Sequence, residues 1–94
     1  MSTNYTTNNK ELVTTEQGGF ATYDLGLAAA LITKGFELGG MDRSNPRRVL
    51  FSFGPEDDQL KSVVNAYLTD RLNLQARSYF DNLRAVKNRL HDAV

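Results

Sequence analysis

One segment of the chain predicts a helix that is apolar around most of its circumference: "TYDLGLAAALITKG", from Thr22 to Gly35. Thr22 is suited to cap its N-terminus, Asp24 complements the positive end of the helix dipole, and Gly35 fits the left-handed residue that ends many helices. A helix that is apolar on nearly all sides is usually buried on more than one side. In a chain of 94 residues, the segment therefore predicts either a central helix or a subunit interface.

The overall composition limits the chain to one small domain and excludes several kinds of chemistry. Ninety-four residues suffice for a single domain. The absence of cysteine excludes disulfides, thiolate nucleophiles and zinc–sulfur sites. The 11 basic residues balance the 11 acidic ones, so nucleic acid or an anionic membrane would have to be bound by a local patch.

The first 20 residues differ in composition from the rest of the chain. They are rich in threonine and asparagine, which predicts a flexible tail over residues 1–20, although residues 12–15 ("LVTT") could form an added edge strand. A single compact domain is expected over residues 21–94. The tail lacks the apolar region of a secretory signal, and no apolar run reaches the ~20 residues of a membrane-spanning helix. We expect a cytoplasmic protein with no membrane partner.

The segment "FELGGMDRSNPRRVLFSFG" predicts a β-hairpin, with its turn at Asn45-Pro46. In the second strand, Val49, Phe51 and Phe53 alternate with smaller or polar residues. This alternation is typical of a strand that has one face on the core. We therefore expect both phenylalanines to point into the domain rather than to stack on the bases of a nucleic acid.

Two amphipathic helices are expected after the hairpin. Pro55 is suited to the first position of the first helix, and the acidic residues 56–58 complement its dipole. Apolar residues recur at three- and four-residue spacing in both segments. These residues are Leu60, Val63, Val64, Tyr67 and Leu68, and then Ala76, Tyr79, Phe80, Leu83, Val86 and Leu90. The predicted fold class is α+β: a small antiparallel hairpin sheet of two or three strands packed against three helices, in the order α-β-β-α-α.

No segment predicts an active site. Gly39-Gly40 lacks the lysine and the strand-to-helix context of a phosphate-binding loop. The single histidine, His91, is explained by the negative end of a helix dipole, and the acidic residues 56–58 are explained by the positive end of one. We expect no enzymatic activity, no catalytic or metal-binding residue, no cofactor and no small-molecule substrate.

Two groups of basic residues are candidates for contact with nucleic acid. The candidates are Arg43, Arg47 and Arg48 beside the hairpin turn, and Arg77, Arg84, Lys87 and Arg89 on the last helix. Arginine suits phosphate because its planar guanidinium donates two hydrogen bonds at once. The same residues are also explained as a solvated helix face and as charges that discourage edge-to-edge pairing of the hairpin. The sequence is compatible with both interpretations.

The first helix is the candidate protein interface. Its apolar circumference exceeds what two short helices and one hairpin need for cover. This excess favours a homo-oligomer or a protein partner, bound through the part of the helix near Leu27, Ala30 and Leu31.

The order of the segments resembles a small family from bacteria and bacteriophages that is catalogued only as a domain of unknown function. The resemblance is carried by "TYDLGLAAALITKGFEL", "RRVLFSF", "LKSVVNAYL" and "LQARSYFDNLRAVKNRL", and it covers Thr22 to His91. The matching positions are Thr22, Asp24, Ala28, Ala29, Gly35, Phe51, Phe53, Tyr67, Ala76, Phe80 and Lys87. The resemblance implies a phage or mobile-element setting, and it supplies neither an activity nor a catalytic residue.

Three functional hypotheses follow, in order of preference. The first is a non-enzymatic accessory or adaptor module that acts by binding another macromolecule in a phage or mobile-element setting. The second is a nucleic-acid-associated protein that uses the hairpin arginines and the basic face of the last helix. The third is a phage-type inhibitor that sequesters a host factor.

Overall fold

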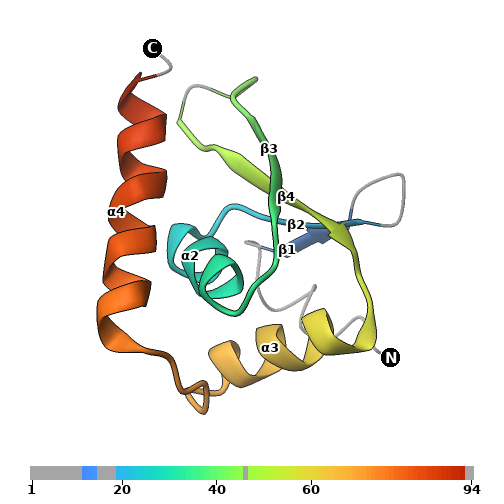
Figure 1. Cartoon of the computed structure of the whole chain (residues 1–94). Coiled ribbons are helices and arrows are strands. Elements are labelled where there is room, and N and C mark those ends of the chain that lie inside the picture. Colours follow the sequence, from blue (N-terminus) through green and yellow to red (C-terminus); the bar gives the residue numbers. More distant parts are fainter. Residues whose placement is uncertain (1–11, 15–18, 46, 93–94) are drawn as a thin grey trace.

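The computed structural model describes residues 12–14, 19–45 and 47–92 (Figure 1). In chain order its elements are β1 (Leu12–Thr14), β2 (Gly19–Thr22), α2 (Leu25–Thr33), β3 (Leu38–Asp42), β4 (Leu50–Pro55), α3 (Asp58–Leu68) and α4 (Ala76–Asp92). Within these residues, three helices pack with one antiparallel sheet, so the predicted α+β class is confirmed.

The sheet of the described residues has four strands, in the spatial order β1-β2-β4-β3. The predicted hairpin consists of β3 and β4, in which Met41 pairs with Phe51 and Asp42 pairs with Leu50. Strand β2 pairs with the other side of β4, and β1 pairs with β2. All three pairings are antiparallel, which leaves β1 and β3 at the two edges of the sheet.

Strand β2 was not predicted from the sequence. The sheet of the described residues therefore has four strands instead of the predicted two or three. Strand β2 is only four residues long, and its threonine, Thr22, has a sequence position that also suits a helix cap. The tail predicted over residues 1–20 falls largely outside the described residues. Inside it, Leu12–Thr14 form the edge strand expected at residues 12–15, and Gly19 and Phe20 belong to β2.

Helix α2 occupies the centre of the fold. All side chains from Leu27 to Leu31 are fully buried. Figure 1 shows the sheet, α3 and α4 arranged on different sides of this helix. Three of the five buried residues are alanines, whose small side chains let the neighbouring elements approach closely. The central helix, one of the two alternatives predicted for this segment, is therefore what the single chain forms.

The cap of α2 differs from the predicted one. The Asp24 carboxylate accepts a hydrogen bond from the Leu27 backbone N–H (3.1 Å), so Asp24 and not Thr22 is the N-cap. The Thr22 hydroxyl instead accepts a hydrogen bond from the Asp24 backbone N–H (3.0 Å). At the other end, Gly35 has a φ of +102°, which agrees with its predicted role at the end of the helix.

Helix α3 begins later than the sequence indicates. Pro55, which was expected at the first helical position, is the last residue of β4. Asp57 caps the helix, and its carboxylate accepts a hydrogen bond from the Leu60 backbone N–H (2.8 Å). The predicted apolar stripe is confirmed, with Leu60 and Val64 buried.

The two central strands contribute three phenylalanines to the core. Phe51 and Phe53 of β4 are 2% and 5% exposed, which confirms that they point into the domain. Phe20 of β2 is equally buried, at 2%, and was not expected. All three belong to the same cluster as Leu27 and Leu31 of α2, so the sheet and the central helix share one core.

Helix α4 packs on α2 along one side only. Val86 is buried, and Tyr79 and Leu90 are half-buried. Phe80, which was expected in the same apolar stripe, is 52% exposed. Phe80 lies one residue after Tyr79, and one residue turns the side chain by about 100° around a helix, away from the packed side.

Replacing Phe20 with alanine is expected to lower the free energy of unfolding by about 3–5 kcal/mol, because the change removes a buried ring and leaves a cavity. Replacing the exposed Phe80 with alanine is expected to change it by less than about 0.5 kcal/mol. Urea unfolding followed by circular dichroism measures both effects. Equal losses of stability for the two substitutions would contradict this assignment of the core.

Candidate functional site

The predicted protein interface lies inside the domain. Leu27, Ala30 and Leu31 each have no exposed surface, because the sheet, α3 and α4 cover α2 on all sides. These residues are core positions in the single chain, and they offer no surface to a second copy or to another protein. The excess of apolar surface expected on this helix is taken up by strand β2 and by the length of α4.

Arg43 joins the β3–β4 hairpin to the end of α4. Its guanidinium donates hydrogen bonds to the backbone carbonyls of Arg89 (3.1 Å) and Leu90 (2.9 Å). Carbonyls in the last turn of a helix have no partner within the helix, and a cation there complements the helix dipole. Arg43 therefore has a structural role, and it brings the hairpin turn and the second half of α4 together (Figure 1).

The other two hairpin arginines are exposed. The backbone N–H of Arg47 donates to the Asn45 side-chain oxygen (2.9 Å), and that of Arg48 donates to the Asn45 backbone carbonyl (3.2 Å). These bonds fix the turn that both arginines extend from. The guanidinium carbon of Arg48 lies 3.9 Å from the centroid of the Tyr23 ring, within the range of a cation–π interaction.

The basic residues of α4 divide into two groups. Arg84, Lys87 and Arg89 are exposed on the second half of the helix, the half that Arg43 contacts. Arg77 lies in the first turn and pairs with Asp81 four residues on, at 3.7 Å, with both side chains well exposed. An exposed pair of this kind contributes little to stability. Arg77 thus lies away from the other candidates for nucleic-acid contact.

More than half of the chain's basic residues therefore lie at one end of the described molecule. We call the hairpin turn and the second half of α4 the basic end. Its six basic residues, out of 11 in the chain, are Arg43, Arg47, Arg48, Arg84, Lys87 and Arg89. Three consecutive acidic residues, Glu56, Asp57 and Asp58, lie at the start of α3, far from the hairpin turn in Figure 1.

Two acidic residues belong to the basic end: Asp42 beside the hairpin turn and Asp92, the last residue of α4. Asp42 accepts hydrogen bonds from the Ser44 hydroxyl (2.5 Å) and the Ser44 backbone N–H (2.9 Å). These two bonds stabilise the ionised carboxylate and lower the pKa of Asp42 below its usual value. Asp42 therefore keeps its negative charge at neutral pH, and it offsets one of the six positive charges.

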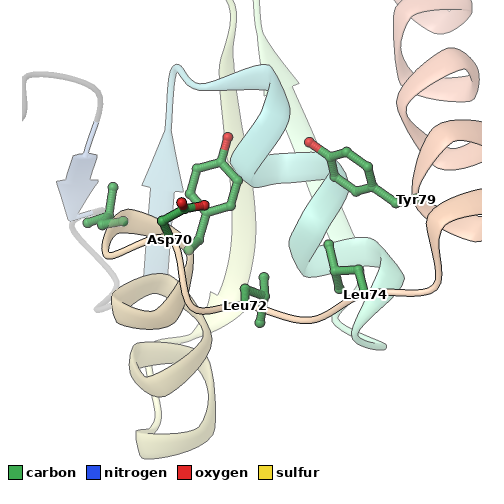
Figure 2. A pocket seen from close by; sticks show the side chains of 6 residues that line it. Asp70, Leu72, Leu74 and Tyr79 are labelled. Atoms are coloured by element: carbon green, nitrogen blue, oxygen red, sulfur yellow. The ribbon is translucent and has the colours of Figure 1, made fainter.

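A pocket of about 440 Å³ opens between α3, α4 and the segment that joins them (Figure 2). Its lining residues are Tyr67, Leu68, Asp70, Leu72, Leu74 and Tyr79. The Tyr79 hydroxyl donates a hydrogen bond to the backbone carbonyl of Gly26 in the first turn of α2 (3.2 Å). A Cβ at Gly26 would lie 2.5 Å from the Tyr67 hydroxyl oxygen, so the glycine leaves room for this second tyrosine.

The surroundings of Tyr67 raise its pKa to about 12. Partial burial is the main cause, followed by the negative charge of Asp24 and the neighbouring Tyr79 hydroxyl. Tyr67 is therefore a neutral hydroxyl at physiological pH, and it lies beside the Tyr79 hydroxyl and the start of α2. The sequence placed both tyrosines in apolar stripes, and nothing in the spacing showed that their hydroxyls would meet.

Within the described ranges, no group of three or more His, Cys, Asp or Glu residues is placed so that it could hold a metal ion. No helix in that part of the chain is long and apolar enough to cross a membrane.

The fold and the basic end define a small α+β domain with basic residues gathered at one end. A family model described as a domain of unknown function (DUF5659) matches residues 17–92. The chain belongs to this family, which confirms the predicted resemblance to a domain of unknown function. No curated protein and no solved structure matches the chain.

The raised pKa of Tyr67 predicts a loss of stability in alkali. Between pH 10 and 12 the tyrosine of the unfolded chain loses its proton while the folded one keeps it, so unfolding becomes more favourable as the pH rises. The contribution is fully present below pH ~10, the pKa of an unperturbed tyrosine. Urea unfolding across this pH range measures the loss.

The matched control is Tyr67→Phe, which keeps the ring and removes the ionisable hydroxyl. We expect the variant to lose less unfolding free energy than the natural chain between pH 10 and 12. The near-ultraviolet absorbance of tyrosinate should also lose a component that titrates near pH 12. If the alkaline loss of stability is the same in both proteins, Tyr67 does not have the surroundings described.

Proposed function

We propose that the protein is a non-enzymatic accessory module that acts by binding another macromolecule, and that this macromolecule is nucleic acid. The single observation that carries the proposal is the basic end. The sequence alone made a protein interface on the first helix the preferred hypothesis, but those residues are buried. The second hypothesis gains because six of its seven hairpin and α4 candidates lie at the end of the molecule where Arg43 joins the hairpin to α4.

A phosphate backbone suits this surface for two physical reasons. Each Lys or Arg that contacts a phosphate releases condensed counterions, so several such contacts on one surface bind a polyanion tightly at low salt. The exposed arginines Arg47, Arg48 and Arg84 also have the planar fork that donates two hydrogen bonds to a phosphate. The acidic residues 56–58 also lie far from this surface, so they repel a phosphate backbone bound there only weakly.

The biological setting is part of the same proposal. The resemblance to a family of bacteria and bacteriophages supports a phage or mobile element, and a nucleic-acid-binding module of such an element would act in the cytoplasm. The inhibitor that sequesters a host factor stays a hypothesis drawn from that resemblance. A homo-oligomer is no longer favoured, because its predicted interface is covered within one chain.

The double substitution Arg47→Ala with Arg48→Ala tests the proposal. It should weaken binding to a fluorescently labelled oligonucleotide and reduce the slope of log affinity against log salt by about 2, because two phosphate contacts are lost. Fluorescence anisotropy at several salt concentrations measures both quantities. Circular dichroism checks that the variant keeps its fold.

The matched control removes the same charge elsewhere. Lys34→Ala with Lys61→Ala takes away two exposed cations outside the basic end, and it should leave the salt slope nearly unchanged. Equal effects of the two double variants would mean that net charge, and not this surface, determines binding. The absence of any binding by the natural chain at low salt would contradict the proposed function, and an acidic protein partner would then be the next hypothesis.

A further inference from the structure

Among the described residues, Phe80 is the one large apolar residue with an exposed side chain. Its ring is 52% exposed on α4, although the protein buries its other described phenylalanines wholly or in part. The guanidinium carbon of Arg84, one turn further along, lies 5.6 Å from the centroid of the ring. An exposed ring beside an arginine offers both a stacking surface and a phosphate contact.

Two hydrogen bonds fix the rotation of α4 about its axis relative to α2. Tyr79 donates to the carbonyl of Gly26 in the first turn of α2, and Asn82 donates to the Thr33 hydroxyl in its last turn (3.0 Å). Each residue advances about 100° around a helix, so Phe80 follows Tyr79 on the side away from Asn82. Phe80 therefore lies on the side of α4 that extends beyond the first turn of α2. We call this side the flank.

The same flank carries two cations of the basic end. Arg84 and Lys87 lie four and seven residues after Phe80, a spacing that places all three side chains on one face of the helix. Both cations are exposed. The flank is thus a strip of one exposed ring and two positive charges, which runs from the first half of α4 toward the hairpin turn.

A second aromatic residue borders the start of α2. Tyr23 directly precedes the N-cap Asp24, and the guanidinium of Arg48 lies over its ring at 3.9 Å. Arg48 is exposed and Tyr23 is half-buried, so the pair lies at the surface with the guanidinium over the ring. Two aromatic–arginine pairs, Phe80 with Arg84 and Tyr23 with Arg48, therefore lie beside the same end of α2.

We infer that the nucleic acid bound by this surface is single-stranded, with one base stacked on Phe80 and another on the Arg48–Tyr23 pair. The inference rests on the proposed function and names the form of its ligand. In a duplex the faces of the bases are hidden in the stack, whereas an unpaired strand exposes them to aromatic rings and arginine planes. Cations alone would bind both forms through their phosphates, and exposed aromatic residues add nothing to duplex binding from outside the grooves.

The experiment compares one single-stranded oligothymidylate of about 12 nucleotides, within the usual range of single-strand sites, with a duplex of the same length. Fluorescence anisotropy is measured at fixed salt for the natural chain, Phe80→Leu and Phe80→Tyr. Phe80→Leu keeps an apolar side chain and the net charge but removes the π face. Phe80→Tyr keeps the π face and serves as the conservative control.

We expect the natural chain to bind the single strand more tightly than the duplex. Phe80→Leu should weaken single-strand binding roughly 5- to 150-fold, the range for one stacked base, and leave duplex binding unchanged. Phe80→Tyr should bind like the natural chain. Because Phe80 is exposed, neither variant should alter the unfolding curve.

The outcomes separate the inference from the function on which it rests. If the natural chain binds neither oligonucleotide, the proposed function is wrong, and the inference falls with it. If it binds both equally and Phe80→Leu changes neither affinity, the proposed function stands and the single-strand inference is overturned. A single-strand preference that survives Phe80→Leu would remove Phe80 from the site and overturn the inference in the form stated.

Discussion

The burial of helix α2 is the constraint on which the rest of the structure depends. Its side chains from Leu27 to Leu31 have no exposed surface, and the sheet, α3 and α4 lie around it to provide that cover. A chain of 94 residues has little other apolar material, so this cover comes from the sheet, α3 and α4 together. The surface that remains for function is what these elements present on their outer sides.

The arrangement around α2 also gathers the basic residues of the hairpin and α4. With α4 laid across α2, its second half comes beside the β3–β4 turn, and Arg43 joins the two by donating to the last carbonyls of the helix. Basic residues that are far apart in the sequence thereby share one end of the molecule. A net charge of zero for the chain conceals this end, because the acidic residues are spread over the chain and three of the 11 lie together at the start of α3. Local charge, rather than total charge, governs attraction to a polyanion.

The parts of the fold that follow from local patterns could be predicted from the sequence. The apolar circumference of α2, the alternation that directs Phe51 and Phe53 inward, and the stripe of α3 depend only on neighbouring residues, and the structure confirms all three. Strand β2 could not be predicted in the same way. Its few residues are stabilised by pairing with β4, a partner some 30 residues later in the chain.

The candidate site was predictable to a similar extent. The sequence shows that the hairpin and α4 contain arginine and lysine, but whether these residues lie close together depends on tertiary packing. The exposure of Phe80 could not be predicted, because its spacing fits the apolar stripe of α4. The rotation of the helix on α2 places the side chain at the surface. The cation–π contact of Arg48 with Tyr23 joins two segments that no local pattern connects.

The most direct test of this account is a two-dimensional amide NMR titration of the protein with a single-stranded oligonucleotide. If the basic end binds nucleic acid, the amide signals of Arg47, Arg48, Arg84 and Lys87 will shift as it is added, while those of residues 56–58 at the start of α3 will not shift. Shifts that are confined to α3, or no shifts at all at low salt, would contradict this account.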